Sequence, residues 1–141
     1  MSDEFKYYYT DVQYLENYDG DTIKFMVDRS FDFGFGIEVG GSYPITVRLF
    51  GIDTYELRSK DPLEKKKAKE AKEFVELLLS SADRIHIETF KDRKGKYGRY
   101  LAKVRVELTG SEEIMDLGER LVDLGLAVEK EYWGVKSKWN T

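Results

Sequence analysis

Hydrophobic periodicity changes twice along this 141-residue chain, and the order of the changes limits the folds available to it. Apolar and polar residues alternate in the segments 22–28 and 44–52, as in half-buried β-strands. From 62 to 80 the apolar residues recur every three or four positions, which is typical of an amphipathic helix. Alternation then returns at 84–89 and 98–108. The pattern therefore predicts strands, a helix, and strands again.

Turn and cap residues mark where some of these elements begin. Asp19-Gly20 follows a segment at 7–17 that is rich in Tyr, Val and Leu, and Asp-Gly is well suited to a tight hairpin. Asp61 is a favourable N-cap, and Pro62 suits the first position of the long helix. Most lysines of this helix lie off its apolar stripe, so we interpret them as a solvated face rather than a track for phosphates.

A short second helix is predicted at 116–124. Asp116 and Glu119 resemble a capping box, and Gly125 suits the position that ends a helix. The apolar residues that we place in register on this helix are Ile114, Leu117, Leu121 and Leu124.

Five strands with a helix between the third and the fourth follow the order of an OB-type barrel. Alternating strands alone would also allow other small barrels, but the position of the helix favours the OB type. The predicted fold class is α+β, a five-stranded OB-type Greek-key β-barrel with two helices, one between strands 3 and 4 and one after strand 5. We expect residues 1–141 to form a single domain, because this length suits one core.

The segment 29–43 is rich in glycine and aromatic residues and is predicted to form an extended hairpin excursion. Its phenylalanines have two readings. They could pack into the core, or they could form an exposed ledge on which bases stack. We favour core packing.

Composition excludes several classes of active site. The chain has no cysteine and a single histidine, His86, so a Cys/His zinc site and a cysteine nucleophile are excluded, and any Ser-His-Asp triad would have to use His86. A bound cation would need oxygen ligands, which indicates calcium, magnesium or manganese.

Charge and hydropathy give expectations about partners and location. No run of about 18 apolar residues is present, and the N-terminus lacks a signal-peptide profile. We expect a cytoplasmic protein that acts as a monomer and does not bind a membrane, although a removed leader would also fit. The net charge of −4 is unusual for a nucleic-acid-binding protein, but the segment 91–99 holds five basic residues and one acid.

Two carboxylates are candidates for binding a metal. Asp21 follows a tight turn at the start of a strand, and Asp53 ends the third predicted strand. The backbone carbonyl of Thr54 could point away from the sheet. Two carboxylates with carbonyl and water oxygens form a site that a hard cation prefers. On its own, Asp21 would be explained as part of the turn, so the predicted metal site depends on Asp21 and Asp53 together.

Two arginines and a further acid could complete a phosphodiester site. Arg48 lies on the strand face opposite Val47 and Leu49, and Arg99 follows a glycine that permits a bend. Guanidinium groups pair well with two phosphate oxygens at once. Glu56, on the loop after Asp53, could orient or deprotonate an attacking water.

Three strings of residues resemble the thermonuclease (staphylococcal nuclease-like) family, over about residues 7 to 133. They are Asp19 to Thr22, Arg48 to Glu56, and Lys96 to Ala102. In that family the positions that match Asp21, Asp53 and the Thr54 carbonyl bind calcium, so the resemblance implies Ca2+ as the cofactor.

The resemblance also implies roles for the remaining site residues. The positions that match Arg48 and Arg99 contact the scissile phosphate, and the one that matches Glu56 is the proposed general base. Those that match Lys96 and Tyr97 help to hold another phosphate and its sugar. Such enzymes cut DNA and RNA and leave 3′-phosphate ends.

The chain departs from the family pattern in places. Tyr55 stands where the family usually has proline, which implies a less rigid loop around Glu56, and Gly95 replaces a frequent acid. Tyr132 and Trp133 fall near stacking tyrosines of the family, but we assign them no role. The leading hypothesis is a calcium-dependent nuclease with DNA or RNA as substrate. A non-catalytic nucleic-acid-binding module and a structural domain with a vestigial site are the alternatives.

Overall fold

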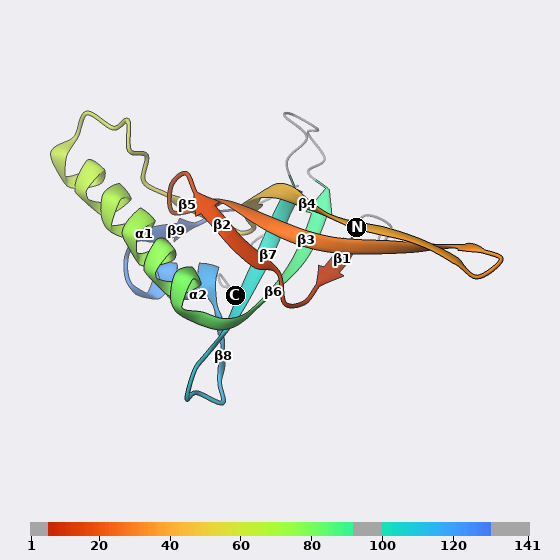
Figure 1. Ribbon diagram of the computed structural model, residues 1–141. Coiled ribbons are helices and arrows are strands. Elements are labelled where there is room, and N and C mark those ends of the chain that lie inside the picture. Colours follow the sequence, from red (N-terminus) through yellow and green to blue (C-terminus); the bar gives the residue numbers. More distant parts are fainter. Residues whose placement is uncertain (1–5, 92–99, 131–141) are drawn as a thin grey trace.

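The computed structural model describes residues 6–91 and 100–130, which form a mostly antiparallel sheet with two helices (Figure 1). The helices are α1 (Pro62–Ser81) and α2 (Leu117–Asp123). The strands are β1 (Lys6–Tyr9), β2 (Gln13–Asn17), β3 (Thr22–Gly34), β4 (Ile37–Leu49), β5 (Ile52–Thr54), β6 (Ala82–Lys91), β7 (Tyr100–Leu108), β8 (Ile114–Asp116) and β9 (Ala127–Glu129).

The main sheet has the order β1-β6-β7-β4-β3-β2, and β8 adds to β7. All of its pairings are antiparallel except the one between β4 and β7, which is parallel. A separate two-stranded sheet joins β5 to β9. This second pairing brings the C-terminal part of the described chain next to the end of β4.

The α+β class and the two helices are confirmed, with α1 between the third and fourth predicted strands. The predicted count of five strands is wrong, because the described residues form nine. The first predicted strand is divided at Asp11, which has a positive φ of 54°, and its halves pair with different neighbours. The third is divided at Gly51, which has a φ of 85°.

A closed barrel is not seen among the described residues. β1 and β2 lie at the two ends of the sheet order and do not pair with each other. They are consecutive in the chain, however, and between them the backbone amide of Val12 donates to the carbonyl of Ile85 on β6 at 3.1 Å. The chain therefore crosses from one end of the sheet order to the other at this point.

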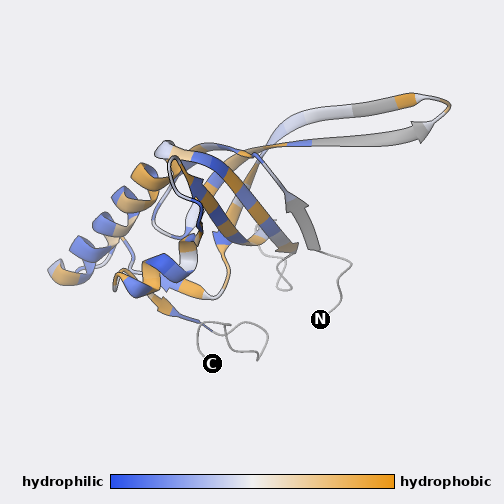
Figure 2. Cartoon of the chain, turned by 90° about the horizontal axis from the view of Figure 1, so that it is seen from below, coloured by the Kyte–Doolittle hydropathy of each residue, from blue (hydrophilic) through white to orange (hydrophobic). Residues whose placement is uncertain are grey.

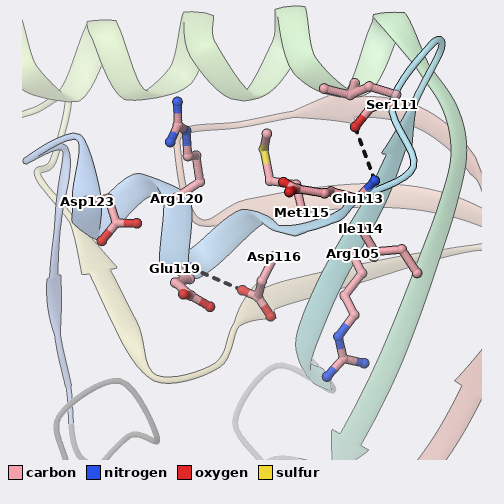
Figure 3. Close-up of a pocket in the computed structure, with 10 residues that line it drawn as sticks. Arg105, Ser111, Glu113, Ile114, Met115, Asp116, Glu119, Arg120 and Asp123 are labelled. Carbon is pink, nitrogen blue, oxygen red and sulfur yellow. Dashed lines mark hydrogen bonds between the residues drawn. The ribbon is translucent and has the colours of Figure 1, made fainter.

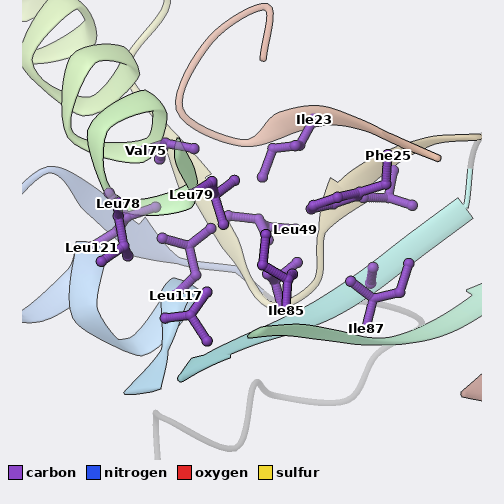
Figure 4. Close-up of a cluster of buried hydrophobic side chains, with 14 of the residues drawn as sticks. Ile23, Phe25, Leu49, Val75, Leu78, Leu79, Ile85, Ile87, Leu117 and Leu121 are labelled. Carbon is purple, nitrogen blue, oxygen red and sulfur yellow. The ribbon is translucent and has the colours of Figure 1, made fainter. Parts of the chain in front are cut away.

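The core lies between the sheet and the two helices (Figure 4). Ile23, Phe25 and Val27 of β3 are completely buried, as their alternation predicted. Val75 of α1 and Leu121 of α2 pack into the same cluster. Figure 2 shows the resulting bands of hydrophobic and hydrophilic residues along the strands.

Both helix starts follow the predicted capping. The Asp61 side chain accepts a hydrogen bond from the Leu63 amide at 3.0 Å, and the Asp116 side chain accepts one from Glu119 at 3.1 Å. At the end of α2, Gly125 takes the left-handed conformation with a φ of 74° and donates to a carbonyl of the last turn.

Two apolar residues assigned to the second helix do not face the core. Ile114 is 58% exposed and Leu124 is 46% exposed. Ile114 lies in β8, before α2 begins, so the direction of its side chain follows the strand and not the helix. Leu124 is the C-cap, at the end of the apolar face. Leu117 and Leu121 are buried as predicted.

The strands β3 and β4 form a long hairpin that extends away from the rest of the protein (Figure 1). Its pairing runs from Thr22 opposite Arg48 to Gly34 opposite Ile37. The hairpin predicted for 29–43 is thus confirmed, but core packing is wrong for Phe35, which is 100% exposed at the turn. The outer part of the hairpin has only two strands, so no further layer covers this residue. Within the described residues, neither helix is long and apolar enough to cross a membrane.

Candidate functional site

A pocket of about 390 Å3 lies where the N-terminal end of β3, the C-terminal end of β4 and the loop after β5 meet. The register places Thr22 opposite Arg48, and the Leu49 amide donates to the Asp21 carbonyl at 2.8 Å. The pocket is lined by Asp19, Asp21, Thr22, Arg48, Asp53, Thr54, Tyr55, Glu56 and Lys130.

The turn before β3 fixes the position of Asp21. One carboxylate oxygen of Asp19 accepts hydrogen bonds from the amides of Asp21 at 3.1 Å and of Thr22 at 2.8 Å. This arrangement, in which a side chain holds the amides that follow it, is common for Asp in turns. It holds the backbone of Asp21 at the start of β3.

Gly20 allows this turn to lie against the rest of the protein. A Cβ atom at this position would come within 2.8 Å of the Cβ of Ala71 and of the Cγ2 of Thr54. Atoms cannot approach so closely without displacing α1 or the end of β5. The glycine is therefore required for close packing between three segments that meet beside the pocket.

Asp21 is buried, with 7% of its surface exposed. Its Oδ2 accepts a hydrogen bond from the Thr54 amide at 3.2 Å and lies 3.7 Å from Nη2 of Arg48. Burial, together with the neighbouring carboxylate of Asp19, raises the pKa of Asp21 to about 6, against the opposing effects of Arg48 and the Thr54 amide. Negative charge at this position is thus only partly compensated by the protein.

Arg48 connects the two carboxylates predicted to bind a metal. Its Nη2 donates to Oδ1 of Asp53 and also faces Asp21. Its Nε is buried and has no acceptor among the described residues. A buried donor of this kind costs stability unless an acceptor reaches it, so the side chain is suited to an oxyanion.

Lys130 was not predicted from the sequence. It follows β9, and its amide donates to the Gly51 carbonyl at 2.8 Å, next to β5. Its Nζ lies 3.4 Å from Oδ2 of Asp53. Sequence alone gave no signal for this contact, because it depends on the long-range pairing of β5 with β9.

Glu56 is exposed on the loop between β5 and α1 and lines the pocket. Its side chain makes no ion pair with any described residue. Its carbonyl accepts a hydrogen bond from the Ser59 amide at 3.1 Å, which closes a turn in the loop. The neighbouring Tyr55 ring lies 5.3 Å from Nζ of Lys67 on α1, a distance at which a cation–π interaction helps to hold the loop.

The structure brings together five of the eight predicted site residues. Asp21, Arg48, Asp53, Thr54 and Glu56 all line the pocket. The other three predictions, Lys96, Tyr97 and Arg99, lie outside the described residues, as do Tyr132 and Trp133.

The donor set of the pocket fits a hard cation. Two carboxylates contact the same Arg48 nitrogen, and a cation close to Asp21 would favour the ionised form that burial disfavours by raising its pKa. Among the described residues, no three acidic or histidine side chains form a metal-binding group by themselves. Backbone carbonyls and water would have to supply the remaining oxygen ligands, as they do in many calcium sites.

A second cavity, of about 550 Å3, lies beside β8 and α2 (Figure 3). Arg105 and Arg120 line it together with the acids Asp116, Glu119 and Asp123. Beside it, the backbone amides of Glu119 and Glu113 donate to the side chains of Asp116 and Ser111, at 3.1 and 3.2 Å. These are capping interactions that serve the fold, so we do not regard this cavity as the functional site.

Residues 46–140 match the family model for staphylococcal nuclease homologues. This is more than half of the chain, and the protein belongs to that family. Asp21 lies outside the matched residues and is placed in the pocket by the structure. A comparison with curated proteins finds no match.

Proposed function

We propose that the protein is a calcium-dependent nuclease. It would hydrolyse single-stranded or denatured DNA, and RNA by the same chemistry, with little sequence specificity, and leave 3′-phosphate ends. The observation that carries the proposal is the convergence of Asp21, Arg48, Asp53 and Glu56 on one pocket in a chain of the staphylococcal nuclease family. We further propose that it acts as a monomeric, OB-like domain.

Asp21 and Asp53, with the carbonyl of Thr54, are the residues proposed to hold Ca2+. Supporting this role, both carboxylates lie in the pocket and Asp21 has a raised pKa. When bound, the cation would stabilise charge on the phosphate and lower the pKa of a water molecule.

Arg48 is proposed to bind the scissile phosphate. Its guanidinium is already in the pocket, and its buried Nε lacks an acceptor among the described residues. Positive charge placed where negative charge develops lowers the barrier to phosphodiester cleavage. A second guanidinium, that of Arg99, and the side chains of Lys96 and Tyr97 are proposed to share in substrate binding on the basis of the family resemblance.

Glu56 is proposed to orient and deprotonate the attacking water. It is exposed on the pocket edge and free of ion pairs with the described residues, so its carboxylate is available to a water molecule. A general base must reach the proton it removes, and an exposed loop position leaves room for a substrate beside it.

A second candidate function is a non-catalytic nucleic-acid-binding module. The observation that favours it is that each oxygen of Asp53 faces a cationic side chain of the protein, Arg48 or Lys130. An acid so fully paired could be a structural group. This alternative predicts affinity for nucleic acid that survives removal of divalent metal.

The test is cleavage of denatured DNA in millimolar calcium, with and without chelator. The nuclease proposal predicts calcium-dependent cutting that falls by at least about a hundredfold in Glu56→Gln. The conservative substitution Glu76→Gln, on an exposed position of α1, is the matched control and should leave cutting unchanged. The proposal would be contradicted if the folded protein cuts DNA with no divalent metal present. It would also be contradicted if the folded protein fails to cut DNA with calcium, with magnesium and with manganese.

A further inference from the structure

Lys130 lies in the candidate site, and the proposed function gives it no role. Its position is fixed by the fold, because its amide hydrogen bond to Gly51 continues the pairing between β9 and β5. Its ammonium group lies 3.4 Å from Oδ2 of Asp53. The fold thus places a positive charge beside a residue that is proposed to bind a cation.

The charges of the pocket limit what Lys130 can do. Four carboxylates line the pocket against two cationic side chains, Arg48 and Lys130. Asp53 presents Oδ1 to Arg48 and Oδ2 to Lys130, so both of its oxygens are engaged. A divalent cation on Asp53 would lie close to both of these positive groups, so like-charge repulsion would weaken at least one of the two contacts.

Of the two contacts that Asp53 makes, the one with Lys130 is more easily broken than the one with Arg48. The Arg48 side chain is 22% exposed and contacts Asp21 as well as Asp53, so moving it would break two interactions. The Lys130 side chain is 38% exposed and carries a strongly hydrated ammonium on a flexible stem. Such a group reorients more readily than the planar guanidinium of Arg48, which two carboxylates hold.

We propose that Lys130 is a metal-dependent phosphate-binding residue. Without a divalent cation, its ammonium group neutralises Asp53. With a cation on Asp53, like-charge repulsion releases Lys130, and its ammonium contacts a phosphate of the nucleic-acid strand next to the scissile one. This inference rests on the proposed function, since it requires that Asp53 bind the metal and that nucleic acid occupy the pocket.

The proposal makes metal affinity depend on Lys130 more strongly than on lysines that lie away from the pocket. Removing a competitor for Asp53 should tighten calcium binding. We expect Lys130→Met to bind calcium about threefold to tenfold more tightly than the unsubstituted protein, as measured by isothermal titration calorimetry without nucleic acid. The control Lys69→Met makes the same change in net charge at an exposed position of α1, and it should stay within about twofold of the unsubstituted protein.

The second measurement concerns the substrate. Binding of a labelled single-stranded oligonucleotide is measured on ice in the Glu56→Gln background, which limits cleavage. With calcium, adding Lys130→Met should weaken binding about threefold to tenfold, and Lys130→Arg should retain it. With chelator instead of calcium, Lys130→Met should change binding by less than about twofold, because the ammonium group then stays on Asp53.

The outcomes separate the two proposals. Suppose that the unsubstituted protein cuts DNA with calcium, but that Lys130→Met and the unsubstituted protein bind calcium equally tightly. The proposed role of Lys130 is then wrong, and the nuclease proposal stands. The same holds if Lys130→Met leaves oligonucleotide binding in calcium unchanged. If the unsubstituted protein neither binds calcium nor cuts, both proposals fail.

Discussion

At the scale of residues, Asp21 shows how a single buried carboxylate can lower the stability of a fold. Its carboxylate is buried beside Asp19, and its pKa is raised to about 6 from an ordinary value of 3.8. Below pH 3.8 the folded and unfolded forms are both protonated, so this residue has no effect on stability. Between 3.8 and 6 the folded form holds a proton that the unfolded form releases, so stability falls as pH rises.

Replacing Asp21 with asparagine should therefore stabilise the metal-free protein at pH 7.5. The shift in pKa corresponds to a gain on the order of 2–3 kcal/mol, and asparagine still has an oxygen that can accept from the Thr54 amide. Thermal unfolding in chelator should show a higher Tm for Asp21→Asn, with a gain that shrinks as the pH approaches 4. The exposed substitution Asp83→Asn is the control. A lower Tm for Asp21→Asn at pH 7.5 would show that its charge is better compensated than the pocket indicates.

At the scale of elements, the long hairpin divides into a root and an arm. The root lies in the sheet and carries Thr22 and Arg48 at the pocket. In the arm, the described side chains at 34–37 and 40–44 are all exposed. These described side chains of the arm therefore add little buried surface to the fold, although its strands are continuous with those that line the pocket.

Shortening the arm should leave the fold intact. Asp28 pairs with Ser42, so replacing residues 29–41 with Asn-Gly would close the strands with a two-residue turn. We expect the free energy of unfolding, measured in urea, to change by less than about 1 kcal/mol. A replacement of the same segment by a flexible Gly/Ser linker of equal length is the matched control. A loss of more than about 1 kcal/mol in both proteins would mean that the arm packs against the folded body, and a loss in the shortened protein alone would mean that the new turn strains the strands.

The elements also show where sequence patterns succeed. Alternation identified the buried face of β3, and capping residues located both helix starts, because these signals depend on neighbours within a few positions. The divided strands were missed, since Asp11 and Gly51 adopt positive φ angles that no local pattern required. Phe35 was misplaced because its residue type favours burial, whereas the turn of a two-stranded arm offers it nothing to pack against.

At the scale of the whole molecule, the same distinction applies to the pocket. Its acids and Arg48 could be proposed from short strings, with a family resemblance to assign their roles. Lys130 could not, because no residue near it in sequence points to Asp53, and only the pairing of β9 with β5 brings the two together. Short sequence patterns do not reveal which distant strands pair, so they could not predict this contact.

The salt dependence of nucleic-acid binding depends on how many cationic side chains contact phosphates, whatever the net charge of −4. If the proposed cationic contacts (Arg48, Lys130, Lys96 and Arg99) are the phosphate contacts, the slope of log affinity against log salt should be about −3 for a single strand. Binding to a labelled oligonucleotide at several salt concentrations, in the Glu56→Gln background with calcium, gives this slope. A value near −6 would mean that the lysines of α1 also track the strand, contrary to our reading of them as a solvated face.

The separation of the pocket residues along the chain has a consequence for synthesis. Asp21, Asp53 and Lys130 come from its beginning, middle and later part, and the third arrives only with β9. A growing chain on the ribosome that ends before this strand would carry Asp53 without its partner sheet. The pocket is complete only once the last described strand has emerged, so a nascent chain that ends before β9 would not hold an assembled pocket.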